Sequence, residues 1–183
     1  MHRTNALASA AVAAALFAGF TPAAADPAED HGRGKRRLKA ELRGFGEVPA
    51  VSTPARGSFR ALLSEDETEI AYRLDYSDLQ GTVTQSHIHL GAHHTNGGIS
   101  VWLCGTAALP GPAGTPVCGE PGGDGPEASG TLTSANVIGP TGQLVAAGEF
   151  AELVRAIKSG VTYVNVHTSA VGSGEIRGQI KVD

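Results

Sequence analysis

The sequence predicts an all-β protein, either an antiparallel β-sandwich or a flattened Greek-key barrel, with one short helix and one disulfide-closed loop. Three observations predict this class. About eight short segments alternate apolar and polar residues, as half-buried antiparallel strands do. Turn-forming residues separate them, in a chain with 25 glycines and 10 prolines. Only one segment has a helical period. With 183 residues, 41% of them hydrophobic, the chain suits a single globular domain.

Residues 1–25 have the pattern of a cleavable secretory signal. A weakly positive start precedes the apolar run 6–20, and three alanines at 23–25 stand before Asp26, as signal peptidases require. The alternative is a membrane anchor, but the run is shorter than the roughly 20 residues of a spanning helix. We therefore expect cleavage, no transmembrane anchor in the mature chain, and a secreted protein that is extracellular or periplasmic.

Residues 26–37 are expected to form a flexible basic linker before a domain that spans 38–183. The linker contains GRGKRR at 32–37, which could make weak contact with anionic surfaces, although a solvated tail is the simpler interpretation. The formal net charge of −4 gives no support for nucleic-acid binding.

The expected strands follow the alternating pattern along the domain. They are LKAELRG (38–44), GSFRALL (57–63), TEIAYRLDYSDL (68–79), TVTQSHIHL (82–90), GISVWL (98–103), SGTLTSANVI (129–138), VTYVNVHT (161–168) and GEIRGQIKV (174–182). The helix is expected within 148–160, where Phe150, Leu153, Val154 and Ile157 fall at i, i+3, i+4 and i+7. Its apolar stripe should cover one open end or edge of the β-structure.

The two cysteines predict a disulfide. Cys104 and Cys118 flank a segment rich in glycine and proline, which cannot sustain a strand or a helix. In an oxidising compartment such a pair most simply forms one bridge, and closing a loop of about 15 residues stabilises the fold by about 3 kcal/mol. A zinc site is the alternative, but the spacing lacks a CxxC pair.

Four of the seven histidines fall between positions 87 and 94. His87 and His89 share one face of their strand, and His167 lies on the corresponding face of a later strand. If the apolar residues between them face the core, all three face outward and could converge where the two strands are neighbours. Three imidazoles suit copper or zinc with an open fourth position, and the loop residues His93 and His94 could add a ligand. Alternatively, the rings bond only to backbone carbonyls.

Three motifs resemble, in this order, the start, middle and end of the CHRD domain, first named from chordin and found in many secreted bacterial proteins. They are LRGFGEVPAVSTPARGSFRALL, HIHLGAHHTNGGISVWL and YVNVHTSAVGSGEIRGQI. The resemblance covers about 38–182 and implies a secreted β-domain without an established enzymatic activity. The growth-factor antagonism of chordin does not carry over to a lone domain.

The chain is also distantly similar to copper/zinc superoxide dismutases. The matching positions are the pair His87 and His89, the later His167, and the glycine-flanked Arg177. The resemblance implies that Arg177 guides an anion to the metal, whereas its plainer role is an ion pair with Glu47 or Glu175. The bridging histidine and the zinc cluster of the dismutases have no counterpart here.

The sequence thus predicts a secreted CHRD-domain binding or structural module with an unknown extracellular partner. It contains no GxSxG, CxxC or HExxH motif and no phosphate-binding loop, so an enzyme is not the favoured interpretation. The alternative is a mononuclear copper or zinc protein with an outward-facing site at His87, His89 and His167, with dismutase-like redox chemistry as an extension.

Overall fold

The structure, a computed structural model, describes residues 35–122 and 127–183. The expected signal at 1–25 and most of the linker at 26–37 lie outside these residues. The first strand begins at Arg36, so Arg36 and Arg37, the last two residues of the expected linker, belong to it. In the part of the chain that is described, no helix is long and apolar enough to cross a membrane.

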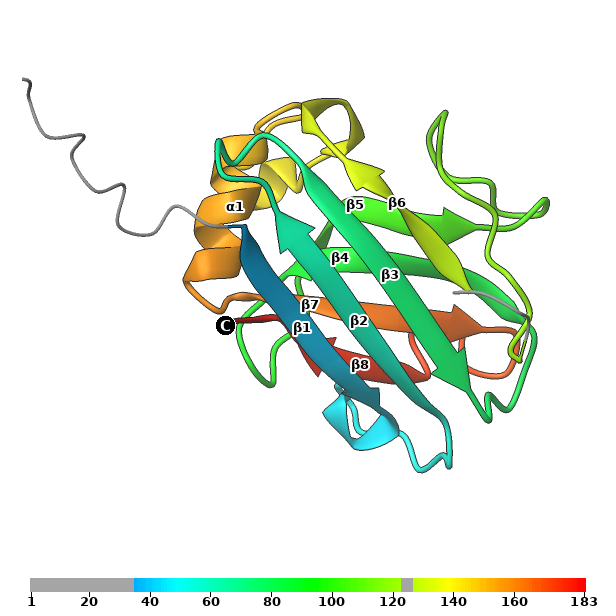
Figure 1. Cartoon of the computed structure of the whole chain (residues 1–183). Coiled ribbons are helices and arrows are strands. Elements are labelled where there is room, and N and C mark those ends of the chain that lie inside the picture. The colour runs from blue at the N-terminus through cyan, green and yellow to red at the C-terminus, as the bar shows by residue number, and fades with distance from the viewer. Residues whose placement is uncertain (1–34, 123–126) are drawn as a thin grey trace, which may run out of the picture. The chain divides into compact units, whose positions relative to one another are not determined.

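The described residues form nine strands and one α-helix (Figure 1). The strands are β1 (Arg36–Arg43), β2 (Arg56–Leu63), β3 (Ile70–Ser77), β4 (Val83–Leu90), β5 (Gly98–Gly105), β6 (Ala128–Leu132), β7 (Thr162–Thr168), β8 (Ile176–Gln179) and β9 (Lys181–Val182), and the helix is α1 (Phe150–Lys158). Three short 3-10 turns are η1 (Gly44–Gly46), η2 (Ser134–Asn136) and η3 (Thr141–Gln143).

All strands belong to one antiparallel sheet with the order β5-β4-β7-β8-β1-β2-β3-β6, and β9 also pairs with β1. The sheet curls until its two end strands, β5 and β6, lie near each other (Figure 1). It is therefore a nearly closed barrel, which confirms the predicted class and selects the barrel over the sandwich.

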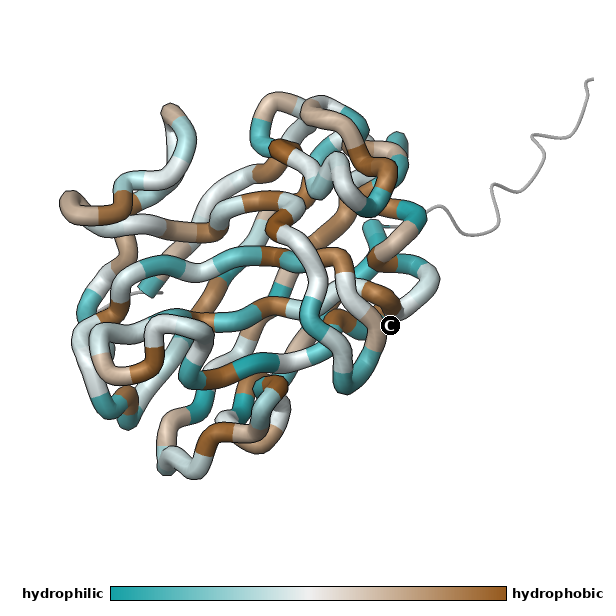
Figure 2. The backbone as a smooth tube through the Cα atoms, turned by 180° about the vertical axis from the view of Figure 1, so that it is seen from behind, coloured by the Kyte–Doolittle hydropathy of each residue, from teal (hydrophilic) through white to brown (hydrophobic). Residues whose placement is uncertain are grey.

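Alternation places the core inside this barrel. Along β1, Leu38, Ala40 and Leu42 are buried while the residues between them are exposed, and the same alternation of apolar and polar positions is visible along the strands in Figure 2. Helix α1 lies across one end, as its apolar stripe predicts, and buries Phe150, Leu153, Val154 and Ile157 against the core.

Two expected strands depart most from the structure, whereas the bounds of the others differ by at most two residues at either end. The strand predicted at 129–138 ends at Leu132, because the Asn136 side chain accepts the Thr133 backbone N–H and starts the turn η2. The strand predicted at 174–182 is divided at Ile180, whose N–H donates to the Thr162 carbonyl. Beyond Ile180 the chain no longer pairs with β7 and pairs with β1 instead, where Val182 is opposite Leu38.

The predicted disulfide between Cys104 and Cys118 is present. It joins the end of β5 to the far end of the glycine- and proline-rich loop, and backbone hydrogen bonds between Gly105 and its partners Pro116 and Cys118 reinforce the closure. The loop packs onto Trp102, because a Cβ atom at Gly111 would lie 2.7 Å from the indole ring. The disulfide thus holds this loop against the Trp102 side chain of β5.

Candidate metal centre

Strands β4 and β7 are antiparallel neighbours, which is the condition for the three histidines to meet. His87 pairs with Asn165, and His89 pairs with Tyr163. This register puts His167 diagonally beside His87, with Nδ1 of His87 3.2 Å from Nε2 of His167. One ring nitrogen from each of His87, His89 and His167 lies within 4.8 Å of the others, so the structure brings the predicted trio together.

The spacing of these nitrogens is close to that of a coordinated ion. Three atoms no more than 4.8 Å apart all lie within about 2.8 Å of a common point, whereas imidazole ligands bind zinc at about 2.0–2.1 Å. Each ring nitrogen would therefore have to move by less than about 1 Å to bind one ion.

Backbone carbonyls contact one nitrogen in two of the three rings. Nδ1 of His89 lies 2.9 Å from the Gly97 carbonyl oxygen, and Nδ1 of His167 lies 3.0 Å from that of Gly172. Because a carbonyl only accepts, Nδ1 of His89 carries the proton, and Nε2 of this neutral ring keeps its lone pair. Nε2 of His167 also faces an acceptor, the side-chain oxygen of Asn165 at 3.1 Å. Metal-binding histidines are commonly oriented in this way, so the expected carbonyl bonds and a metal site are compatible.

The prediction of an outward-facing site is wrong in one respect. The three histidines lie on the sheet face opposite the core, but their exposed fractions are only 0% for His87, 8% for His89 and 7% for His167. Trp102 packs edge-on against His87 at 4.4 Å between ring centroids, and Tyr163 stacks on His89 at 4.7 Å. These aromatic rings and the adjacent loops cover the site.

Burial keeps the rings neutral. It lowers the pKa of His87 to about 2, with a further contribution from His167 and His89, and it lowers the pKa of His89 to about 4. The pKa of His167 is also lowered by burial. Nε2 of His87 and Nε2 of His89 are buried without a hydrogen-bond partner. Such atoms are costly to leave unsatisfied, and a neutral imidazole is the form that binds a metal.

A family model described as CHRD domain matches residues 38–180. The chain belongs to the CHRD domain family. No curated protein and no solved structure matches it. These comparisons therefore offer no support for the resemblance to copper/zinc superoxide dismutases, which stays a prediction.

This CHRD domain surrounds its histidines with two polar residues that the sequence did not single out as part of the site. The side-chain oxygen of Asn165 lies 3.1 Å from Nε2 of His167, and the Asn165 side chain also hydrogen-bonds Glu47. Glu47 is buried, and burial raises its pKa to about 7 although Arg177 lowers it. Asn165 could have been inferred from its position beside His167 on β7, whereas Glu47 lies on a loop whose path no periodic pattern predicts.

Arg177 lies close to the site, but the expected ion pair is not formed among the described residues. Its guanidinium is 3.3 Å from the Tyr163 ring centroid and donates to the carbonyls of Ala92 and Thr95. Glu175 instead accepts hydrogen bonds from two threonine hydroxyls and a backbone N–H. Arg177 is only 3% exposed and holds a loop to the sheet, so its role as an anion guide stays a prediction.

The loop histidines do not join the trio in the CHRD domain. His93 and His94 are exposed and contact each other, with ring centroids 4.3 Å apart. Among the described residues, the group of ligand atoms within 4.8 Å contains only the trio.

Proposed function

We propose that this CHRD domain is a secreted binding module that holds one copper or zinc ion with His87, His89 and His167. The observation that carries this proposal is the pair of buried ring nitrogens, Nε2 of His87 and of His89, that have no hydrogen-bond partner. Both belong to rings of the trio, and Oε1 of the nearby Glu47 is likewise buried without a partner. A metal ion would satisfy lone pairs that the protein itself leaves unsatisfied.

The donor set limits the choice of metal. Neutral imidazoles suit copper and zinc, and copper(II) is bound more tightly than zinc by a given set of nitrogen ligands. Thiolate ligation is absent because the cysteines form a disulfide. Such bridges are typical of oxidising compartments, which supports a secreted location together with the signal pattern of residues 1–25.

The burial of the three histidines favours a metal ion that stays bound, and not a catalytic ion that must be accessible to substrate. Catalytic zinc sites keep a position open to water or substrate, whereas none of the three rings is more than 8% exposed. A bound ion could supply Lewis-acid or redox chemistry, but the covered site favours a structural or carrier role. We therefore assign no enzymatic activity.

The test is the metal content of the mature, untagged protein, measured by mass spectrometry. We expect about one copper or zinc ion per chain, lost in the variant His87→Ala/His89→Ala/His167→Ala and kept in the matched variant His93→Ala/His94→Ala. Should the triple variant fail to fold, the single variant His89→Gln is expected to bind metal at least tenfold more weakly. A folded wild-type protein that neither contains nor takes up copper or zinc would refute the proposal.

If the protein binds no metal, its proposed function is that of a binding or structural module with an unknown extracellular partner. The membership of the CHRD family supports this coarser function with or without a metal. The histidines would then serve only to anchor the loops that their Nδ1 atoms contact.

A further inference from the structure

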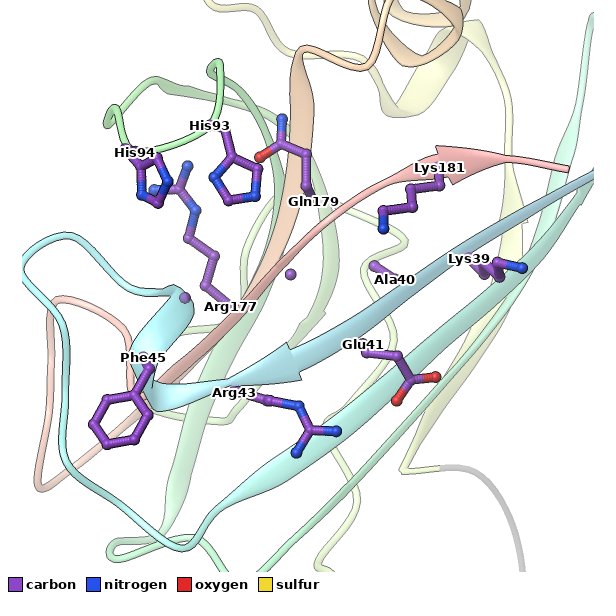
Figure 3. A pocket seen from close by; sticks show the side chains of 12 residues that line it. Lys39, Ala40, Glu41, Arg43, Phe45, His93, His94, Arg177, Gln179 and Lys181 are labelled. Carbon is purple, nitrogen blue, oxygen red and sulfur yellow. The ribbon is translucent and has the colours of Figure 1, made fainter.

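A second site lies on the outer face of the barrel, beside the histidine cluster but separate from it. Figure 3 shows a cavity whose floor is formed by β1, β8 and β9. His93 and His94 hang over the floor from the loop after β4, and Phe45 of η1 stands on the opposite side. The volume is about 380 Å³, which lies within the range of small-molecule sites.

The lining of this cavity is cationic. Lys39, Arg43, Arg177 and Lys181 line it against one acidic residue, Glu41. The four residues occupy opposite positions on the paired strands, because Arg43 pairs with Arg177 and Lys39 pairs with Lys181. Like charges that line one cavity favour a negatively charged occupant.

Two of the four cations remain available to a ligand. Lys39 is bound to Asp183 at 2.6 Å, and Arg177 is buried beneath the loop. Within residues 35–122 and 127–183, by contrast, Arg43 and Lys181 have no ion pair or side-chain hydrogen bond, and both are exposed.

The walls of the cavity are fixed before any ligand binds. Arg177 donates to the loop carbonyls of Ala92 and Thr95, and the Gln179 amide donates to the Gly91 carbonyl at 2.9 Å. Asn96 ties the same loop to the segment after η1 through the Val48 carbonyl at 3.0 Å. A preformed site saves the free energy of ordering loops on binding.

An aromatic ring and a free acceptor complete the lining. Phe45 is 76% exposed, so its ring offers an apolar face to an occupant of the cavity. Gln179 donates through its amide nitrogen, which leaves the amide oxygen to accept from a hydroxyl group. The cavity thus combines positive charge, an apolar face and a hydroxyl acceptor.

We infer that this cavity binds an acidic saccharide, a sugar ring that carries a carboxylate or a sulfate. The acidic group would contact Arg43 and Lys181, the apolar ring face would pack on Phe45, and a hydroxyl would donate to Gln179. This inference does not depend on a metal at the histidine cluster.

The experiment is calorimetric titration of the full-length mature protein with four probes. These are a sulfated heparin disaccharide, digalacturonate, the neutral disaccharide maltose, and sodium sulfate. We expect at least one acidic disaccharide to bind at least tenfold more tightly than maltose or sulfate, and the affinity to fall as salt is raised, since salt screens exposed charges. The heparin disaccharide carries a carboxylate as well as sulfates, whereas digalacturonate carries carboxylates only. Binding of both acidic probes therefore indicates that a carboxylate is recognised, and binding of the heparin disaccharide alone indicates that sulfate is required.

Three variants locate the site. Arg43→Gln/Lys181→Gln should weaken binding of the acidic probe at least tenfold, and Phe45→Ala should weaken it several-fold. The matched control Arg60→Gln removes one exposed charge from β2 outside this cavity and should change affinity less than twofold. Equal affinity for maltose and the acidic disaccharides would overturn the inference, as would equal affinity for sulfate alone, absence of binding at millimolar ligand, or an undiminished affinity in the double variant.

Discussion

The replacement Glu47→Gln tests how the buried carboxyl beside the histidine cluster affects stability. Burial raises the pKa of Glu47 from 4.5 to about 7. A raised pKa means that the folded state favours the protonated carboxyl, so its stabilising contribution is complete below pH 4.5 and is lost as the pH rises through 7. Glutamine mimics the protonated form and stays neutral at every pH.

The magnitude follows from the difference between the two pKa values. The two pKa values differ by about 2.5, and each pKa unit is equivalent to about 1.4 kcal/mol, so the difference corresponds to about 3 kcal/mol of unfolding free energy. The variant should therefore gain up to about 3 kcal/mol in unfolding free energy relative to the wild type between pH 4.5 and pH 8.5. For a chain of this size the relative gain in Tm is about 6–12 °C.

The assay is urea unfolding of both proteins at several pH values with a chelator present. All other titratable groups are common to both proteins, so the difference between them isolates Glu47. The matched control Glu41→Gln removes an exposed carboxylate from the outer face of β1 and should shift the difference by less than about 0.5 kcal/mol. A difference that stays constant across the pH range, or that favours the wild type at pH 8.5, would refute the reasoning.

Three further predictions concern the histidines, the disulfide and the covering loop. In the Glu47→Gln background and with a chelator present, the free energy of unfolding should fall as the pH drops from 6.5 toward 4. The reason is that burial lowers the pKa of His89 to about 4, so the unfolded chain takes up the proton first. In urea titrations, His89→Asn should reduce this fall by up to about 3 kcal/mol. The double variant Cys104→Ser/Cys118→Ser should lose about 3 kcal/mol in urea unfolding. Gly97→Ala should lower both Tm and metal affinity, because its Cβ would lie 1.7 Å from a backbone oxygen of β4 and the Gly97 carbonyl holds His89.

Each of these has an outcome that would contradict it. An unchanged pH profile in His89→Asn would show that this ring is not held neutral by burial. Equal urea midpoints with and without the cysteines would mean that the loop needs no cross-link. Gly142 provides the control for Gly97, because an added methyl group there would meet nothing within 4 Å. Gly142→Ala should leave metal affinity unchanged. An equal effect of the two substitutions would show that the loop does not orient His89.

The strands and the convergence of the trio could be predicted because they depend on period-two alternation, which is a local property. Counting along two strands puts His87, His89 and His167 on matching faces, and the pairing of β4 with β7 then brings them together. The disulfide was equally accessible, since only two cysteines had to be matched.

The environment of the trio could not be predicted, because it depends on contacts between segments far apart in the sequence. The burial of His89 follows from Tyr163 and from a loop whose path has no periodic signature. Arg177 donates to backbone carbonyls, which every residue has, so charge matching with Glu175 predicts the wrong partner. Glu47 lies on an irregular segment, where spacing along the chain says nothing about what a side chain meets.

The loop from Gly91 to Gly97 connects the outer cavity to the histidine cluster. Its last carbonyl orients His89, and its middle residues form a wall of the cationic cavity and are held by Arg177. A substitution that reshapes this wall also moves the carbonyl that orients the ring. The shape of the outer cavity and the orientation of the His89 ring therefore depend on one segment of the chain, and a change in one is expected to alter the other.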